Sequence, residues 1–89
     1  MKFVLNKCFG GPSLSSAAME ILGRPDQWFA DNDEEVIQLI EEHGSEFCSG
    51  RFSKLIVVEI PEDATDWEFT EYDGIEGITY VQGGRLYHL

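Results

Sequence analysis

The chain has 89 residues, of which 43% are hydrophobic, and it carries 17 acidic against 6 basic side chains. This length predicts one domain over residues 1–89, since domains span about 50 to 250 residues. The net charge of −11 argues against direct nucleic-acid binding, because affinity for phosphate backbones depends on Lys and Arg.

Cysteine content and hydropathy indicate the cellular compartment of the protein. The two cysteines, Cys8 and Cys48, are too few for a disulfide scaffold. The start of the chain, MKFVLNKC, lacks the apolar segment of a signal peptide, and no apolar run is long enough to span a bilayer. We therefore expect a cytoplasmic protein with reduced thiols and no membrane contact. So small a domain buries little surface, and we expect it to form a homo-oligomer.

The first elements are a strand and a helix. Residues 2–7 contain three successive apolar residues and predict a short strand. Apolar residues then recur at helical spacing over 14–22, with Ser13 or Ser15 as the N-cap and Gly23 as the end. The connection that follows contains Trp28 and Phe29, which we expect over the core or in an interface.

A second helix and a buried strand come next. Asn32 and Glu35 resemble a capping box, residues 36–40 form an apolar stripe, and Gly44 ends the helix. KLIVVEIP is a continuous apolar run closed by Pro61, which is typical of a strand that is buried on both faces.

The last third of the chain changes to a period of two. DWEFTEYDG alternates aromatic and polar residues, which predicts a half-exposed strand that ends at Asp73-Gly74. GITYVQGGRLYHL predicts a hairpin that turns at residues 82–84.

The predicted order is β-α-α-β-β-β-β. Helices join the first strand to the strand at 55–60, so we expect these two strands to be parallel. The predicted fold is a two-layer α+β domain with one mixed sheet of about five strands, covered on one face by two helices. A second copy of the chain is a plausible cover for the other face.

The loop NKCFGGPSLSS between the first strand and the first helix is a candidate anion site. Gly10 and Gly11 allow close backbone approach, and hydroxyl groups at the helix start can donate to an anion. Lys7 and Arg51 would add positive charge. The loop matches neither a Walker A motif nor a dinucleotide fingerprint, so a purely structural turn stays an open alternative. The candidate ligand-binding residues are Asn6, Lys7, Gly10, Gly11, Ser13, Ser15, Arg51, Trp67 and Tyr72.

Other reactive residues give little support for catalysis. Cys8 precedes a helix, a position that lowers a thiol pKa, but the sequence places neither His43 nor His88 beside it. Glu71, Asp73 and Glu76 are close in sequence and are explained by a turn. No Cys/His pair has metal-ligand spacing, so we predict no metal, no cofactor and no enzyme activity.

Three motifs resemble a family of small uncharacterised proteins that phages and prophages encode. They are NKCFGGPSLS, GRFSKLIVVEIPED and EYDGIE. Pro12 departs from the family, which usually has an aromatic residue after the two glycines, and Gly77 stands where the family commonly has Trp. The resemblance brings no known activity, but it implies a phage protein that acts on host immunity.

Two functions follow as the main hypotheses, and a small hydrolase that uses Cys8 or the group Glu71, Asp73 and Glu76 is a third alternative, which the missing nucleophile–base pair disfavours. In the first, the chain sequesters a small anionic ligand derived from a nucleotide, such as an immune signal, with Trp67 or Tyr72 stacked on the base. In the alternative, the chain is an acidic inhibitor, with some resemblance to DNA, that blocks a basic host protein directly.

Overall fold

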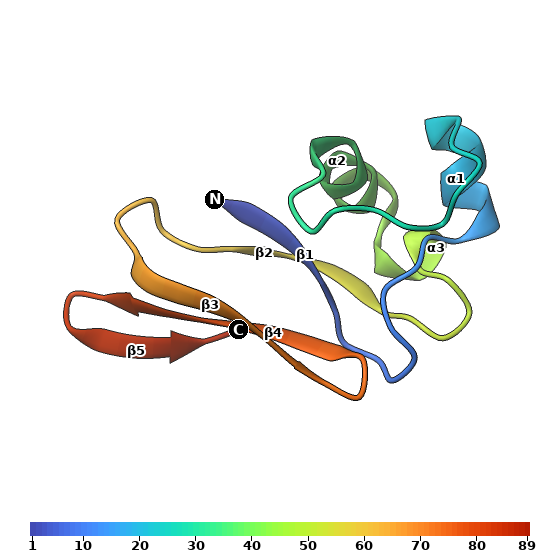
Figure 1. The fold of residues 1–89 in the computed structure, drawn as a ribbon. Helices are drawn as coiled ribbons and strands as arrows, with labels where there is room; N and C mark the ends of the chain where they lie inside the picture. Colours follow the sequence, from blue (N-terminus) through green and yellow to red (C-terminus); the bar gives the residue numbers. More distant parts are fainter.

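The strands form two sheets rather than the single sheet predicted. The computed structural model describes residues 1–89, and its class is α+β as expected (Figure 1). Strands β1 and β2 form one sheet, and strands β3, β4 and β5, in that order, form the other. The elements are β1 (Lys2–Asn6), α1 (Ser16–Leu22), α2 (Glu34–His43), α3 (Ser45–Cys48), β2 (Leu55–Glu59), β3 (Thr65–Tyr72), β4 (Ile75–Gln82) and β5 (Arg85–His88).

β1 and β2 are antiparallel, and the prediction of a parallel pair was wrong. Lys2 pairs with Glu59 and Asn6 with Leu55. The reason is α3, a single turn that the sequence analysis missed. After α2, this turn and the following loop bring the chain back to the end of β1 that it left, so β2 starts beside Asn6.

The β1–β2 sheet is the middle of three layers, where two were predicted (Figure 1). Its helix-facing side belongs to a core that includes Val4, Leu14, Val36 and Leu55. Its other side packs against the β3–β5 meander, through residues such as Phe3. Because both faces are buried, neither strand shows alternation in its sequence. The chain's own meander thus covers the face for which a second copy was expected, and the homo-oligomer stays a prediction.

The helix ends follow local sequence signals. Ser15 caps α1 by accepting the Ala18 N–H at 3.0 Å, and Gly23 ends the helix with φ +67°. α2 begins one residue later than predicted, because Asp33 rather than Asn32 accepts N–H groups of the first turn. With ten residues, α2 is the longest helix, too short to cross a bilayer.

The meander follows the predicted hairpins. β3 turns into β4 at Asp73-Gly74, where both residues have positive φ, and β4 turns into β5 at Gly83-Gly84. The register of β3 against β4 is regular from Glu68 to Tyr72 and shifts between Thr65 and Glu68.

Candidate functional site

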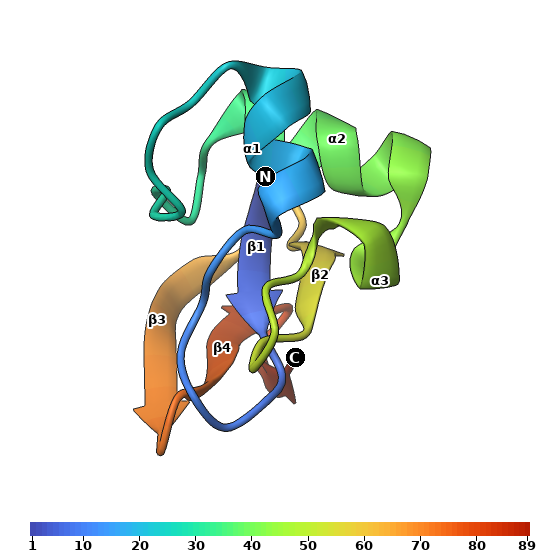
Figure 2. The same ribbon diagram turned by 90° about the vertical axis from the view of Figure 1, so that its right-hand side faces the viewer.

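The glycine loop lies in a junction where all three resemblance motifs meet. The Asn6 side chain is fully buried and contacts each of them. Its amide donates to the carbonyl oxygens of Cys8 at 2.7 Å and Gly74 at 2.6 Å, and its oxygen accepts the Lys54 N–H at 2.8 Å. One side chain therefore joins the loop after β1, the start of β2 and the β3–β4 turn, which Figures 1 and 2 show at the same end of the molecule.

The glycines of this junction allow three backbones to touch. Gly10 and Gly11 have φ values of +118° and +82°. A Cβ at Gly10 would lie 2.8 Å from the Phe52 carbonyl oxygen, and one at Gly74 would lie 2.6 Å from the Gly11 nitrogen. Because protein backbone already occupies the space beside Gly10 and Gly74, these two glycines serve close packing in this structure, whereas Gly11 has open space beside its Cα and is set apart only by its positive φ.

Three other predicted anion donors, Lys7, Ser13 and Ser15, are also engaged within the protein. The Lys7 amine donates to the carbonyl oxygens of Glu76 at 2.6 Å and Leu89 at 3.2 Å. Ser15 caps α1, and the Ser13 carbonyl accepts the Ser53 hydroxyl at 2.9 Å. Neither of the two hollows in the structure is lined by Gly10, Gly11 or Lys7.

Glu76 places a half-buried carboxylate in the junction. Its Oε1 accepts the backbone N–H of Asn6 at 2.8 Å. Burial raises the pKa of Glu76 above its ordinary value, and the hydrogen bond from Asn6 opposes this shift. The carboxylate thus stabilises the junction by accepting a hydrogen bond, while the partial loss of water around its charge destabilises it.

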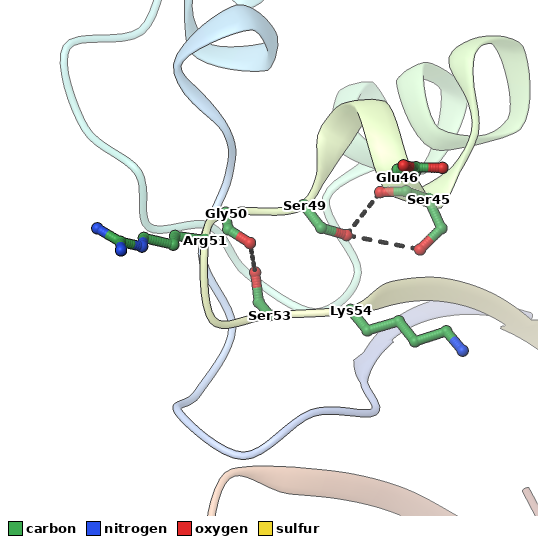
Figure 3. A pocket seen from close by; sticks show the side chains of 7 residues that line it. All are labelled: Ser45, Glu46, Ser49, Gly50, Arg51, Ser53 and Lys54. Atoms are coloured by element: carbon green, nitrogen blue, oxygen red, sulfur yellow. Dashed lines mark hydrogen bonds between the residues drawn. The ribbon is translucent and has the colours of Figure 1, made fainter.

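The larger hollow lies beside the junction, under α3 (Figure 3). Its volume is about 490 Å³. It contains Arg51, one of the predicted residues, and Lys54, and neither forms an ion pair. The Arg51 guanidinium lies 5.3 Å from the Phe52 ring centre and points away from the serines in Figure 3. The hollow is lined by Ser45, Glu46, Ser49, Gly50, Arg51, Ser53 and Lys54.

The two predicted stacking residues do not share a site. Trp67 packs against Phe3, with ring centres 5.4 Å apart, on the side of β3 that faces β1. Tyr72 is 75% exposed and stands five residues further along β3, about 17 Å away, next to the junction. Trp67 and Tyr72 therefore cannot hold one small base together with Arg51.

Strand β3 is the longest element of the molecule whose residues are all exposed. All eight of its residues are exposed, and it is an edge strand that pairs only with β4. Aromatic residues alternate along it with the acids Asp66, Glu68 and Glu71. The sequence pattern predicts a half-exposed strand here, and Phe69 was not among the candidate residues. The alternation of acidic and aromatic residues in the sequence of β3 could have indicated Phe69.

The remaining reactive side chains are dispersed. His43 stacks on Phe47 with ring centres 5.0 Å apart, and His88 of β5 is the strand-pairing partner of Thr79 of β4. Cys8 is partly buried in the glycine loop and makes no side-chain hydrogen bond to either histidine. The chain contains no group of three metal-ligating side chains close enough to share an ion.

No family model, curated protein or solved structure matches this chain. Its function therefore has to be inferred from the chemistry of its own residues.

Proposed function

We propose that this chain is a non-enzymatic binding protein whose meander recognises a basic protein. The observation that supports this proposal is strand β3, an edge strand with eight exposed residues on which aromatic and acidic side chains alternate. Protein interfaces are enriched in Tyr, Trp and Phe, and acidic residues around such anchors favour a basic partner.

The aromatic anchors of this surface are held in place before any partner arrives. The Phe3 ring lies 5.4 Å from Trp67 and 5.2 Å from Phe69, and Trp67 and Phe69 are themselves 5.7 Å apart. Both β3 rings stay more than a third exposed. Rigid, exposed aromatic groups bind with a small loss of conformational entropy, which is typical of residues that dominate binding energy.

The charge of the chain favours the same kind of partner. Lys and Arg side chains pair with only three of the 17 carboxylates, those of Asp33, Glu35 and Glu41. None of these three lies on the meander. The unpaired acids create a negative potential that accelerates encounter with a basic surface.

The resemblance to phage-encoded proteins supports a more specific form of the proposal. The partner would be a basic protein of host defence in the cytoplasm, and binding would block it directly.

The proposal is tested with host proteins captured at low salt. Glu68→Lys reverses a charge on β3, whereas Glu42→Lys makes the same change of charge on α2, in the helical layer. We expect a basic partner that binds the wild type and Glu42→Lys, is lost with Glu68→Lys and dissociates as salt is raised. Equal loss in both variants would show that only net charge matters, and a salt-resistant complex would contradict an acidic recognition surface.

A second candidate function, sequestration of a small anionic ligand, is favoured by the hollow under α3. The side chains of Arg51, Lys54 and Arg85 are the three Lys and Arg side chains with neither a carboxylate partner nor a hydrogen bond. The Arg51 and Lys54 side chains point in opposite directions in Figure 3, so a phosphate group in this hollow would be held by both cations only after they turn towards it.

Titration with pyrophosphate, followed by NMR of the backbone amides, tests this candidate. We expect shifts confined to residues 45–54, abolished by Arg51→Gln with Lys54→Gln. Arg85→Gln removes the same kind of charge on β5 and should leave the shifts unchanged. Shifts that persist in the double variant would exclude the hollow as the site.

A further inference from the structure

We infer that the free edge of β3 accepts an extended basic segment of the partner as a fourth strand of the meander. This inference rests on the proposed function, protein recognition by β3, and adds the mode of binding and the pattern of the segment. Strand addition of this kind uses main-chain hydrogen bonds for affinity and side-chain pairing for selectivity.

The hydrogen bonds of the meander identify which groups face the edge. Ile78 and Leu89 exchange two backbone hydrogen bonds, at 2.9 and 3.2 Å, on the β5 side of β4. A residue of an antiparallel strand bonds to one side only, so Ile78 does not bond to its β3 partner Phe69. The backbone N–H and C=O groups of Phe69, and by alternation those of Glu71, therefore point away from β4.

Nothing in the chain satisfies these edge groups. No backbone hydrogen bond outside the β3–β4 ladder involves residues 66–72. The bulge between Thr65 and Glu68 ends the regular register, so the usable edge runs from Glu68 to Tyr72. This edge has the length of an ordinary short strand.

The side chains of the edge determine what it accepts. A second copy of β3 would bring acidic side chains close together, which disfavours pairing between copies. A segment with Lys or Arg opposite Glu68 and Glu71, and an apolar residue opposite Phe69, would pair favourably on both faces. Continuing the antiparallel order of the meander, this pattern reads Val-Lys-Thr-Val-Lys from the position opposite Tyr72 to that opposite Glu68.

The probe is a capped peptide with this sequence, added to the whole chain and followed by amide hydrogen exchange. We expect slower exchange at Phe69 and Glu71, with no change at Thr70, whose N–H already bonds to β4. The control is the same peptide with its edge-facing nitrogens methylated, which keeps the charge and removes the main-chain donors. It should give no protection.

A matched pair of variants isolates one backbone group of the edge. Glu71→Ala and Glu71→Pro both remove the carboxylate, but only Glu71→Pro also removes the edge-facing N–H, at a position where an edge strand tolerates proline. We expect Glu71→Pro to bind the peptide about fivefold more weakly than Glu71→Ala, as the loss of one hydrogen bond predicts.

Three results would overturn the inference. Equal binding of the methylated peptide would show attraction by charge alone, and the proposed function would stand without strand addition. Protection of Phe69 and Glu71 that grows with protein concentration, without peptide, would identify a second copy as the occupant. Absence of peptide binding would contradict the stated pairing, while partner capture by the wild type but not by Glu68→Lys would still support the proposed function.

Discussion

Asn6 stabilises the fold through contacts that no other side chain of its junction could make together. Its amide has donors and an acceptor on one planar group, and it uses them toward three separate segments. Leucine or alanine at this position would leave a buried N–H and two carbonyl groups without partners. The chemistry of one amide therefore explains why motifs far apart in sequence need one another.

We predict that Asn6→Ala lowers the free energy of unfolding by about 3 kcal/mol, because buried polar groups without partners cost about 1 to 3 kcal/mol each. Urea unfolding followed by tryptophan fluorescence measures the change. Asn6→Asp keeps the acceptor for Lys54 but loses both donors, and it should destabilise the fold at least as much. A change below about 1 kcal/mol in Asn6→Ala would show that water replaces the amide.

Glu76 gives the junction a predicted pH dependence. Because burial raises its pKa in the folded state, the folded chain holds this proton more tightly than the unfolded chain does. Stability from this group is therefore greatest at low pH, and it falls as pH rises from the ordinary pKa through the raised one. Asp33 behaves oppositely: hydrogen bonds from Arg24 lower its pKa, so its contribution is lost as pH falls.

The variant Glu76→Gln tests the predicted direction of this change in stability with pH. Glutamine keeps an oxygen that can accept the Asn6 N–H and removes the half-buried charge. We expect the variant to gain stability relative to the wild type as pH rises from 4 to 7, measured as the difference between their urea midpoints. A difference in stability that stays constant or moves the other way between pH 4 and 7 would contradict a raised pKa of Glu76.

At the scale of elements, the two hairpin turns of the meander differ: one only reverses the chain, and the other also packs against the glycine loop. Gly74 in the β3–β4 turn has φ +87° and lies against the glycine loop, whereas Gly83 in the β4–β5 turn has φ +58° and open space around it. Two hairpin turns with similar backbones therefore have different requirements.

We predict that Gly74→Ala destabilises the chain more than Gly83→Ala does. At Gly83 the cost is only that of a left-handed alanine, about 1 to 2 kcal/mol. At Gly74 the same cost applies, and the new methyl group also clashes with backbone at 2.6 Å. Thermal unfolding of both variants gives the comparison, and equal losses would show that the glycine loop moves away without penalty.

Local sequence patterns predicted most helices and strands. They did not predict how strands that are distant in the sequence pair with one another. Gly23 and Gly44 end helices with a backbone conformation that glycine favours, so the sequence alone identified them, and it narrowed the N-cap of α1 to Ser13 or Ser15. The direction of β2 depends on α3, whose four residues are too few to show a period. The unbroken apolar run of β2 indicated two buried faces, but it did not reveal that a meander covers one of them.

The candidate site shows the same difference between what local sequence predicts and what depends on distant contacts. The sequence indicated that the glycine loop was special, and it is, but as a place where backbones touch. Whether Lys7 points to solvent or to the carbonyl groups of Glu76 and Leu89 depends on contacts across most of the chain. The exposure of β3 likewise depends on which strands pair with it, a property of the whole sheet.

At the scale of the whole molecule, charge is the dominant feature. Seventeen carboxylates share a body of 43 × 25 × 18 Å with only six Lys and Arg side chains. At low ionic strength, repulsion between acids spread over such short distances opposes folding, since the Debye length exceeds their spacing. The pairs of Lys2 with Glu41 and of Arg24 with Glu35 offset little of this, because exposed ion pairs contribute about 0 to 1 kcal/mol. The bidentate pair of Arg24 with Asp33 is better shielded from solvent, but it neutralises only one of the 17 carboxylates.

We therefore predict that sodium chloride stabilises the free protein while it weakens the complex with a basic partner. The melting temperature of the chain alone should rise between low salt and physiological ionic strength, because screening reduces repulsion more than it weakens the few ion pairs. Glu42→Lys reduces the net charge without touching the meander, so its melting temperature should depend less on salt. A melting temperature that falls with salt would mean that pairs such as Arg24–Asp33 outweigh the repulsion. The acids would then have to be regarded as parts of stabilising networks, and the case for an unpaired acidic surface would fail.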